Sequence, residues 1–580
     1  MYYSLFSVCC LPLMMVGISS PLVAQVSLTC PSSRVVFQRD NANRANVPIA
    51  GNCPANATSV QARLVVRAGQ NGAATGWQTI DAAPVNGCFQ GALPNVTGGW
   101  YDLDVKAFEA GTELGSVSVE RVGVGEVFVT AGQSNAWGGT FPMGQATDDR
   151  VSVVSSMNWN NAPGEFDESR LPLTFSPATL GLSGLMGMAP MAPLGVWGAL
   201  GDRLVARLGV PVLFFGASRP GSRSFNWADA AAGVEMQGET CDIYSYCKNA
   251  PYRSLGAAIL HYLKRTGVRA VLWHQGESDN FYRTRDGTPQ LYIDQIGSVI
   301  AKTRAQSGFA NLSWVVSRAS YVPAVYGPDY VNHETDPVII AAQDFLASQP
   351  NNWPGPATDT MIYPNYRVAE NDHIHFGDAD APALADVWNA ALSATFFSAV
   401  QPSLPARRVL LTTGYVFPFA ATPGQVVAVP YLSAVPVLPG NQYAVELLTE
   451  GGCWLTTLTA NTTNPISVTL PAWANGRYRF RVRSTAPAIT GEPNEPISVV
   501  GVGTGLPPGT DWPHNATLRN GRWDEPGVWA CGCMPGSQEA VDLNHVITIP
   551  ATLRTRAQRL TYGPGSRLIY EAGGRLMLGK

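Results

Sequence analysis

The sequence predicts a multidomain protein whose central α/β domain, built on a parallel sheet, is flanked by β-sandwich and other β-rich domains. Three observations lead to this fold class. The chain has 580 residues, which is enough for several domains. Only 14% of them are charged, whereas Gly (58) and Pro (44) are plentiful, as in strand- and turn-rich proteins. Strands alternate with helical segments only between residue 125 and about residue 400.

The segments outside that region have the pattern of β-structure. Residues 25–121 alternate apolar and polar residues over short runs divided by Gly, Asn and Pro, which predicts a β-sandwich. Residues 403–502 are strand-like with turn clusters, as in an immunoglobulin-like sandwich. Residues 503–580 contain short strands and Gly turns, and either a small β-module or the first coils of a β-helix would fit them. The turn Pro402–Pro405 is expected to be a boundary that few contacts cross.

Within residues 122–402, each strand and helix has its own signal. Leu200, Leu204 and Leu208 share one helical face that ends at Gly209. Ser254 and Thr288-Pro289 are cap signals for two further helices, and a last helix begins near Asp380 and runs to about residue 399. Continuous apolar runs predict buried parallel strands between these helices: EVFVTA, VPVLFFGAS, VRAVLWHQ and NLSWVVS.

The N-terminus indicates export. Residues 4–24 are uncharged and apolar and end in a small residue, as in a signal peptide, although no Lys or Arg precedes them. Pro12 and Pro21 interrupt this stretch and no stop-transfer charges follow, which disfavours a membrane anchor. We therefore expect residues 1–24 to be a signal peptide, with no integral membrane segment after cleavage. The protein would then be secreted, periplasmic or attached to the cell surface.

Charge and cysteine content limit the partners. Lys and Arg total 38 and Asp and Glu total 42, which argues against nucleic acid because its binders usually carry a basic excess. Without the two cysteines of the leader, eight remain, and an even number in an exported chain predicts disulfides. Cys241–Cys247 would close a short loop, and Cys30–Cys53 is the second candidate pair. Cys531-Gly-Cys533 lacks a second Cys/His pair nearby, so no metal site is expected.

A serine stands directly after the strand EVFVTA, in the turn Gly132-Gln133-Ser134-Asn135. A strand-to-helix turn lies at the carboxyl edge of a parallel sheet, where ligands bind in such folds. The backbone N–H groups of the turn can also face an oxyanion. Taken alone, the GQS tripeptide fits an ordinary turn equally well.

A carboxylate and an imidazole share one short loop, Asp372-His373-Ile374-His375. Asp372 can hold one ring nitrogen of His375 while the other nitrogen accepts a proton from a serine. The chain has only seven His, so two within three residues is unusual. His373 is the alternative base, although as the direct neighbour of Asp372 it reaches that carboxylate less easily. A solvated turn or a metal pair is the competing interpretation, but no third metal ligand stands at an obvious spacing.

A third motif, Trp273-His274-Gln275-Gly276-Glu277, ends the strand VRAVLWHQ. A Gln side chain at the carboxyl end of a strand is a neutral donor suited to a developing oxyanion. His274 points to the opposite side of the strand and is expected in the core. Glu277 is interpreted first as a structural hydrogen-bond acceptor.

Together, AGQSNA, WHQGESD and DHIHF resemble the sialate O-acetylesterase and carbohydrate acetylesterase branch of the SGNH hydrolases, over about residues 122–400. The resemblance implies a flavodoxin-like, three-layer α/β domain and a catalytic triad of Ser134, His375 and Asp372. It also implies an oxyanion hole formed by the Ser134 amide, the Gln275 side chain and a backbone glycine.

One block departs from the family pattern. The family commonly has Gly-Gly-Thr/Ser before a Trp, whereas this chain has GASRPGSRSFNW. Gly221 keeps the spacing to Trp227 and is our choice for the oxyanion glycine, although Arg219-Pro220 is unlike the family. We assign substrate contacts to Asn135, Trp227 and Glu277. Trp137 and Trp159 are further candidates for stacking on sugar rings, although aromatic residues in loops more often form local core.

The sequence thus predicts a secreted serine esterase that removes O-acetyl groups from an acetylated poly- or oligosaccharide and needs no metal or organic cofactor. Two alternatives stay open. The β-modules after residue 400 are compatible with a surface adhesin or glycan-binding protein in which the hydrolase domain is only a scaffold. The Met- and Gly-rich stretch 184–200 is compatible with the acyl pocket of a broader esterase or lipase.

Overall fold

The protein is described from a computed structural model. It describes residues 26–579 except for 139–144, 155–174, 178–194, 235–248, 283–287, 324–334, 369–371, 406–409 and 552. The predicted signal peptide, Trp159 and the candidate pair Cys241–Cys247 lie outside the described residues. No helix in the described ranges is both long and apolar enough to span a bilayer.

The N-terminal part consists of two β-sheets that share one core. One sheet is antiparallel, in the order β1 (Ser27–Cys30), β3 (Arg44–Asn52), β6 (Cys88–Thr97). The other contains β4 (Ser59–Val66), β5 (Gln78–Asp81), β7 (Gly99–Glu109) and the first half of β8 (Thr112–Gly132). Val47 and Ile49 of the first sheet and Leu64 and Leu103 of the second are fully buried in the common core. Alternating apolar residues on both sheets produce this arrangement.

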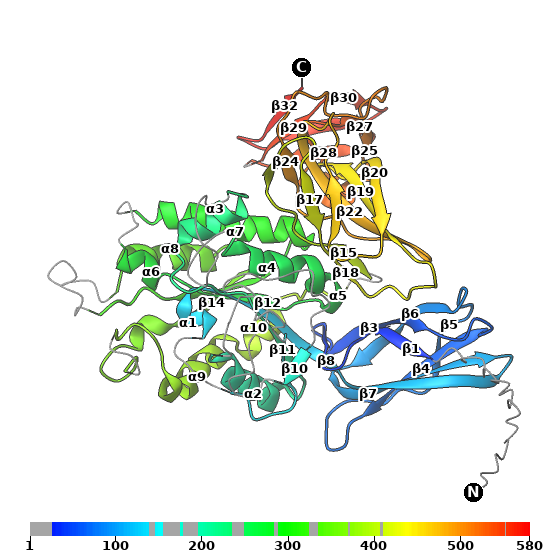
Figure 1. The fold of residues 1–580 in the computed structure, drawn as a ribbon. Helices are drawn as coiled ribbons and strands as arrows, with labels where there is room; N and C mark the ends of the chain where they lie inside the picture. The colour runs from blue at the N-terminus through cyan, green and yellow to red at the C-terminus, as the bar shows by residue number, and fades with distance from the viewer. Residues whose placement is uncertain are drawn as a thin grey trace, which may run out of the picture.

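Strand β8 connects this part to the central sheet (Figure 1). Its first half alternates between exposed and half-buried residues and pairs with β7, whereas from Val122 to Gly132 every residue is buried. That second half pairs in parallel with β11 (Val212–Gly216) and β12 (Ala270–His274). A strand covered on both faces has a continuous apolar sequence, which is why EVFVTA is recognisable in the chain.

The central sheet has the order β10-β9-β11-β8-β12-β13-β14. Its pairs from β9 to β14 are parallel, and β10 is antiparallel to β9 at the edge. The remaining strands are β9 (Val151–Val154), β10 (Phe175–Pro177), β13 (Trp314–Arg318) and β14 (Asn352–Ala357). The mixed α/β class with a central sheet and further β-rich parts is therefore confirmed, while the flavodoxin-like layering and the sandwich folds stay predictions.

Helices pack on both faces of this sheet (Figure 1). On one face, the buried core includes side chains of α3 (Ser224–Ala231), α4 (Tyr252–Ala258), α7 (Gln290–Ser307) and α8 (Pro337–Ala347). On the other, it includes side chains of α2 (Trp197–Leu208), α9 (Ala381–Ala391) and α10 (Ala394–Ala399). Pleat alternation divides neighbours between the faces: Val127 and Val129 join the first core and Phe128 the second.

The helix ends predicted from the sequence agree with the structure in some cases and differ in others. Helix α2 ends at Gly209, which has a left-handed φ of 69°, as its glycine cap predicts. Helix α4 begins at Tyr252, so Ser254 lies inside it rather than at its cap. It continues through a π-turn at Ile259–Leu263 and α5 (Lys264–Thr266).

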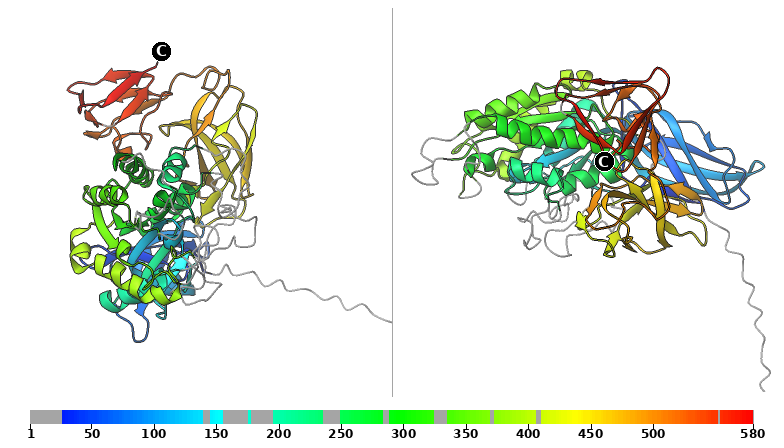
Figure 2. Two further views of the ribbon diagram at one scale, coloured as in Figure 1. Left: turned by 90° about the vertical axis from the view of Figure 1, so that its left-hand side faces the viewer. Right: turned by 90° about the horizontal axis from the view of Figure 1, so that it is seen from above.

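Two β-rich parts follow residue 402. Strands between residues 411 and 499 form small sheets, the largest with the order β16-β24-β22-β19-β20. These strands are β16 (Ala420–Ala421), β24 (Ile497–Val499), β22 (Gly476–Thr485), β19 (Tyr443–Thr449) and β20 (Trp454–Asn461). Residues 514–578 form three parallel sheets whose strands recur in turn, the pairing found in coils of a β-helix (Figure 2).

The expectation that few contacts cross Pro402–Pro405 is wrong. Buried residues of 410–506 belong to the same apolar core as α3, α4 and α7. The His261 Nδ1 atom lies 2.7 Å from Thr412 Oγ1, and Lys264 forms an ion pair with Glu492 at 2.7 Å. The α/β domain and the following β-structure are therefore joined by a continuous interior.

The predicted disulfide Cys30–Cys53 is also wrong, because both residues are free thiols. Cys30 lies opposite Ala50 in the β1–β3 ladder, whereas Cys53 follows the end of β3. Among the described residues, a disulfide joins Cys453 to Cys531, 78 residues apart. It fastens the module after residue 503 to the β-structure before it, a link that local spacing could not indicate.

Candidate active site

Ser134 is held at the carboxyl end of β8, where the chain turns into the short helix α1 (Ser134–Trp137). Gly132 makes this turn possible: its φ is 135°, and a Cβ there would lie 2.0 Å from the backbone oxygen of His274. Only glycine fits such a position. The Ser134 side chain keeps a small exposed surface, with a relative exposure of 8% for the residue.

The predicted triad residues meet at this point. His375 Nε2 lies 2.7 Å from Ser134 Oγ, and His375 Nδ1 lies 2.5 Å from Asp372 Oδ2. Burial alone would raise the pKa of the Asp372 carboxyl, but the hydrogen bond and charge of His375 hold it well below its ordinary value. An ionised Asp372 fixes the proton on Nδ1, which leaves Nε2 able to accept the serine proton.

Asp372 also shapes the loop that carries His375. Its Oδ1 atom accepts hydrogen bonds from the backbone N–H groups of Ile374, at 2.8 Å, and His375, at 3.2 Å. An Asp side chain often accepts hydrogen bonds from the backbone N–H groups two and three residues further along, and this Asx-type turn is therefore a local feature of the sequence. The alternative base, His373, is turned elsewhere: its ring stacks on Tyr363 with centroids 4.0 Å apart.

Asn135 connects the serine turn to the histidine loop. Its Oδ1 accepts from the Phe376 N–H at 3.2 Å, and its Nδ2 donates to the Ile374 carbonyl at 3.3 Å and to Glu277 Oε1 at 2.8 Å. The residue is 1% exposed. The predicted substrate contact therefore does not fit Asn135, whose amide instead joins the serine turn to the loop that carries His375.

Glu277 is the centre of a buried ionic cluster and is likewise closed to substrate. Its Oε1 lies 3.1 Å from His274 Nε2 and 3.5 Å from Arg367 NH1. Burial alone would raise the pKa of Glu277, but the charges of His274 and Arg367 lower it to about 2. The structural role expected for Glu277 and the interior place expected for His274 fit this arrangement.

Sequence reasoning missed Arg367. This fully buried residue donates to the Ile374 carbonyl of the histidine loop, and its guanidinium lies 3.9 Å from the Phe376 ring centroid. It belongs to no motif and has a left-handed φ of 59°. No motif singled it out, because its nearby partners stand at irregular spacings and Glu277 lies in a distant segment of the chain.

Gln275 lies beneath the site rather than open to it. Its Nε2 atom donates to the Asp279 carboxylate and, at 3.1 Å, to the Ser222 carbonyl, and its Oε1 accepts from the Tyr292 hydroxyl at 2.9 Å. Both amide hydrogens are therefore engaged, and the side chain is fully buried. The predicted oxyanion role of Gln275 does not fit this conformation, in which it holds the loop of residues 217–223 that precedes α3.

Gly221 belongs to that loop. The Arg219 N–H donates to the Gly132 carbonyl at 2.9 Å, which places the loop beside the end of β8. Gly221 is exposed and has a φ of 66°, which an L side chain rarely adopts. Arg219, two residues before Gly221, thus meets the end of β8, while the oxyanion role of Gly221 stays a prediction.

The predicted sugar contact of Trp227 is wrong. Trp227 lies inside helix α3 rather than in a loop and is 0% exposed. Its Nε1 donates to Ser222 Oγ at 2.9 Å, and its ring packs edge-on against Trp273. Trp137, at the end of α1, is half-buried and packs against the core beside α2 and α9.

A comparison with protein families finds one match, over part of this region. Residues 124–336 match the family described as "Carbohydrate esterase, sialic acid-specific acetylesterase". The resemblance to this esterase family is confirmed. The matched segment includes Ser134 and ends before Asp372 and His375, so the assignment of these two residues depends on their contacts with Ser134.

Among solved structures, the chain is similar to a crystal structure described as a novel carbohydrate acetylesterase from Xanthomonas citri. The two share 16% sequence identity with a TM-score of 0.39, and the alignment covers 81% of this chain and 99% of that one. No curated protein matches the sequence.

Proposed function

We propose that this protein is an exported carbohydrate O-acetylesterase that works through an acetyl-serine intermediate, in an SGNH-type α/β domain. The observation that carries the proposal is the contact of His375 with Ser134 Oγ at 2.7 Å through one nitrogen and with Asp372 at 2.5 Å through the other. The esterase family match of residues 124–336 supports the ester as the bond that is cleaved.

In the first half of the reaction, Ser134 Oγ attacks the acetyl carbonyl carbon while its proton passes to His375 Nε2. The tetrahedral intermediate collapses when the bond to the sugar oxygen breaks, and that oxygen takes the proton from His375. In the second half, water gives a proton to His375 and attacks the acetyl-serine carbonyl. Collapse releases acetate, and the proton returns to Ser134.

The developing oxyanion would be stabilised by the backbone N–H groups of Ser134 and Gly221. Donors fixed in a turn are already oriented before charge develops, so they need little reorganisation in the transition state. Gln275 would act on this hole indirectly, because its amide holds the carbonyl of Ser222, the residue that follows Gly221.

Acetate release from acetylated xylan, acetylated pectin and O-acetylated sialosides tests the proposal. We expect release from at least one of these substrates, with Ser134→Ala retaining less than about a thousandth of the rate. Folding of the variant is checked by circular dichroism. If the intact chain releases no acetate from any of them, or if folded Ser134→Ala stays active, the proposal is wrong and the scaffold or broader-esterase alternative gains.

A further inference from the structure

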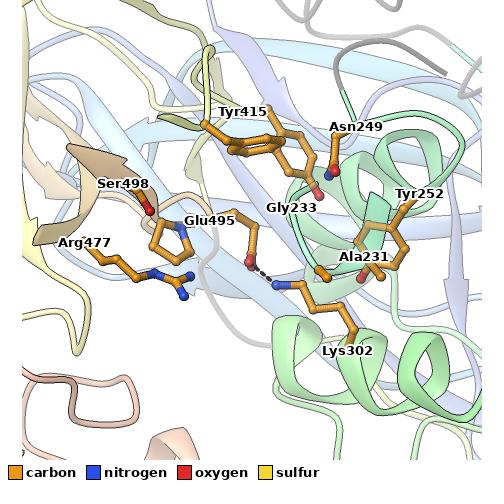
Figure 3. A pocket seen from close by; sticks show the side chains of 12 residues that line it. Ala231, Gly233, Asn249, Tyr252, Lys302, Tyr415, Arg477, Glu495 and Ser498 are labelled. Carbon is orange, nitrogen blue, oxygen red and sulfur yellow. Dashed lines mark hydrogen bonds and ion pairs between the residues drawn. The ribbon is translucent and has the colours of Figure 1, made fainter. Parts of the chain in front are cut away.

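A polar cavity lies between the α/β domain and the β-structure after residue 402 (Figure 3). The space between its walls amounts to about 490 Å³, which includes the part that is open to solvent. One wall comes from the end of α3, from Asn249 and from α7, and the other comes from Tyr415, the Glu495 loop and β24. None of its lining residues belongs to the proposed triad or oxyanion hole.

Asn249 has an unused acceptor at this cavity. Among the described residues, its Oδ1 atom has no hydrogen-bond partner, although the residue is only 3% exposed. Figure 3 shows its amide beside Tyr415, at the cavity. A buried amide oxygen without a donor costs about 1–3 kcal/mol, so a ligand hydroxyl that donates to it would gain a prepared partner.

The charges around the cavity are balanced. Lys302 of α7 forms an ion pair with Glu495 (Figure 3), and Arg477 Nε lies 3.1 Å from Glu450 Oε1. Because each cation already has a carboxylate, the lining offers no uncompensated charge to a charged ligand. An ammonium has three N–H donors, so Lys302 can also serve a neutral acceptor.

The remaining lining combines a hydroxyl with apolar surface. Ser498 on β24 points away from the core, between the buried residues Ile497 and Val499, and contributes the hydroxyl. Tyr415 and Ala231 provide apolar wall. Hydroxyl acceptors and donors set in a partly apolar pocket are the chemistry that recognises a sugar ring.

We propose that this cavity binds an uncharged sugar unit of the polysaccharide at a site separate from the esterase centre. The identification of the ligand as a sugar rests on the proposed function. The unused Asn249 acceptor and the balanced charges are observed independently of that proposal. A second site on the same molecule raises the effective concentration of the chain near its polymer.

The test is ligand-observed NMR titration of the full chain with xylotriose, cellotriose and mannotriose, none of which carries an acetyl group. Asn249→Gly removes the amide and suits the left-handed φ of 65° at this position. Asn351→Gly is the matched control, because Asn351 is exposed and has a φ of 64°. Ser498→Trp fills the cavity, and Ser467→Trp on the exposed face of β21 (Ile466–Thr469) is its control.

We expect saturable binding of at least one neutral trisaccharide to the intact chain and to both controls. Binding should weaken about 2- to 12-fold in Asn249→Gly, as for one lost hydrogen bond, and disappear in Ser498→Trp. Three results would overturn the inference: no saturable binding to the intact chain, equal affinity in folded Asn249→Gly and Ser498→Trp, or preference for digalacturonate over the neutral sugars. Hydrolysis of a small acetyl ester by the intact chain is measured in parallel, so that acetate release without sugar binding refutes this site alone.

Discussion

At the scale of single residues, the two histidines of the 372–375 loop separate a catalytic role from a local one. His375 bridges Ser134 and Asp372, whereas His373 stacks on Tyr363. We expect His375→Ala to lower kcat by about the factor that Ser134→Ala does, because the serine then has no base. His373→Ala should keep most of the activity. Steady-state kinetics on a small acetyl ester measure both, and the reverse order of severity would show that the wrong histidine has been chosen.

Gln275 tests how the oxyanion hole is supported. Gln275→Ala would leave the Ser222 carbonyl and the Asp279 carboxylate without this donor in the interior. We expect a lower kcat together with a lower Tm, because each buried polar group without a partner costs about 1–3 kcal/mol. The exposed Gln290→Ala, which loses only a contact with Asp294, is the control. A large fall in kcat at unchanged Tm would instead return Gln275 to a direct oxyanion role.

Glu277 makes the fold sensitive to acid. Its pKa is about 2 in the folded protein, against an ordinary value of 4.5 for a glutamate side chain. Because the folded pKa is the lower one, its contribution to stability is complete above about pH 4.5 and is lost as the pH falls toward 2. We expect Glu277→Gln to be less stable than the unsubstituted protein at pH 7. Between pH 4.5 and pH 2, the variant should lose less stability than the unsubstituted protein does. Denaturant unfolding across pH measures this against exposed Glu109→Gln, and equal slopes for all three chains would refute it.

Residues whose roles depend on short spacing could be predicted from the sequence, and residues whose partners are distant could not. Asp372 and His375 are three positions apart, so their contact is nearly local. Arg367 and Asn135 acquire their roles from tertiary placement: the Asn135 amide reaches a carbonyl 239 positions away. The prediction for Trp227 is wrong because SFNWADAA, the sequence of α3, contains no strong helix signal.

At the scale of elements, the strands of the central sheet that are buried on both faces are the ones that could be recognised from the sequence. The continuous apolar runs of β8, β11, β12 and β13 identify them. Strand β14 was missed because its sequence, NWPGPA, contains two prolines and a glycine, which disfavour a strand. It lies at the end of the parallel order, where missing N–H donors are tolerated.

Helix α4 depends on a glycine for its contact with the β-structure. A Cβ on Gly256 would lie 1.8 Å from the Tyr415 hydroxyl, whereas a Cβ on Gly297 of α7 would first meet Leu346 at 4.0 Å. We expect Gly256→Ala to lower the free energy of unfolding, since Tyr415 must move. Gly297→Ala should raise it by up to about 1 kcal/mol through helix propensity alone. Denaturant unfolding compares the two, and stabilisation by both substitutions would contradict the close packing at Tyr415.

At the scale of the whole molecule, changes in composition along the sequence indicate where the domains divide, but they do not indicate how the domains pack against one another. Linker-like residues such as Pro402 and Pro405 predict a boundary, and a boundary in sequence says nothing about apolar surfaces that meet elsewhere. Here Tyr252 and Leu255 of α4 share a core with Tyr415 and Val416. The Cys453–Cys531 disulfide then joins the last module to that combined body.

Removal of residues 403–580 tests what this shared core contributes. All proposed catalytic groups lie between Ser134 and His375, so a chain of residues 26–402 keeps the chemistry. It loses the β-structure that covers α4, the hydrogen bond between His261 and Thr412, and the ion pair of Lys264 with Glu492. Burying one large apolar side chain is worth about 1.5–3 kcal/mol, so several exposed together should lower the Tm markedly.

We therefore expect the short chain to cleave a small acetyl ester at a rate near that of the full chain at low temperature, and to lose this activity on heating before the full chain does. Relative to the full chain, its rate on insoluble polysaccharide should fall more than its rate on the small ester, because the cavity that includes Tyr415 and Ser498 is gone. Thermal unfolding and both rates are measured on the two chains. An equal Tm would show that the β-structure adds nothing to the core, whereas an inactive but folded short chain would show that residues beyond 402 complete the esterase site.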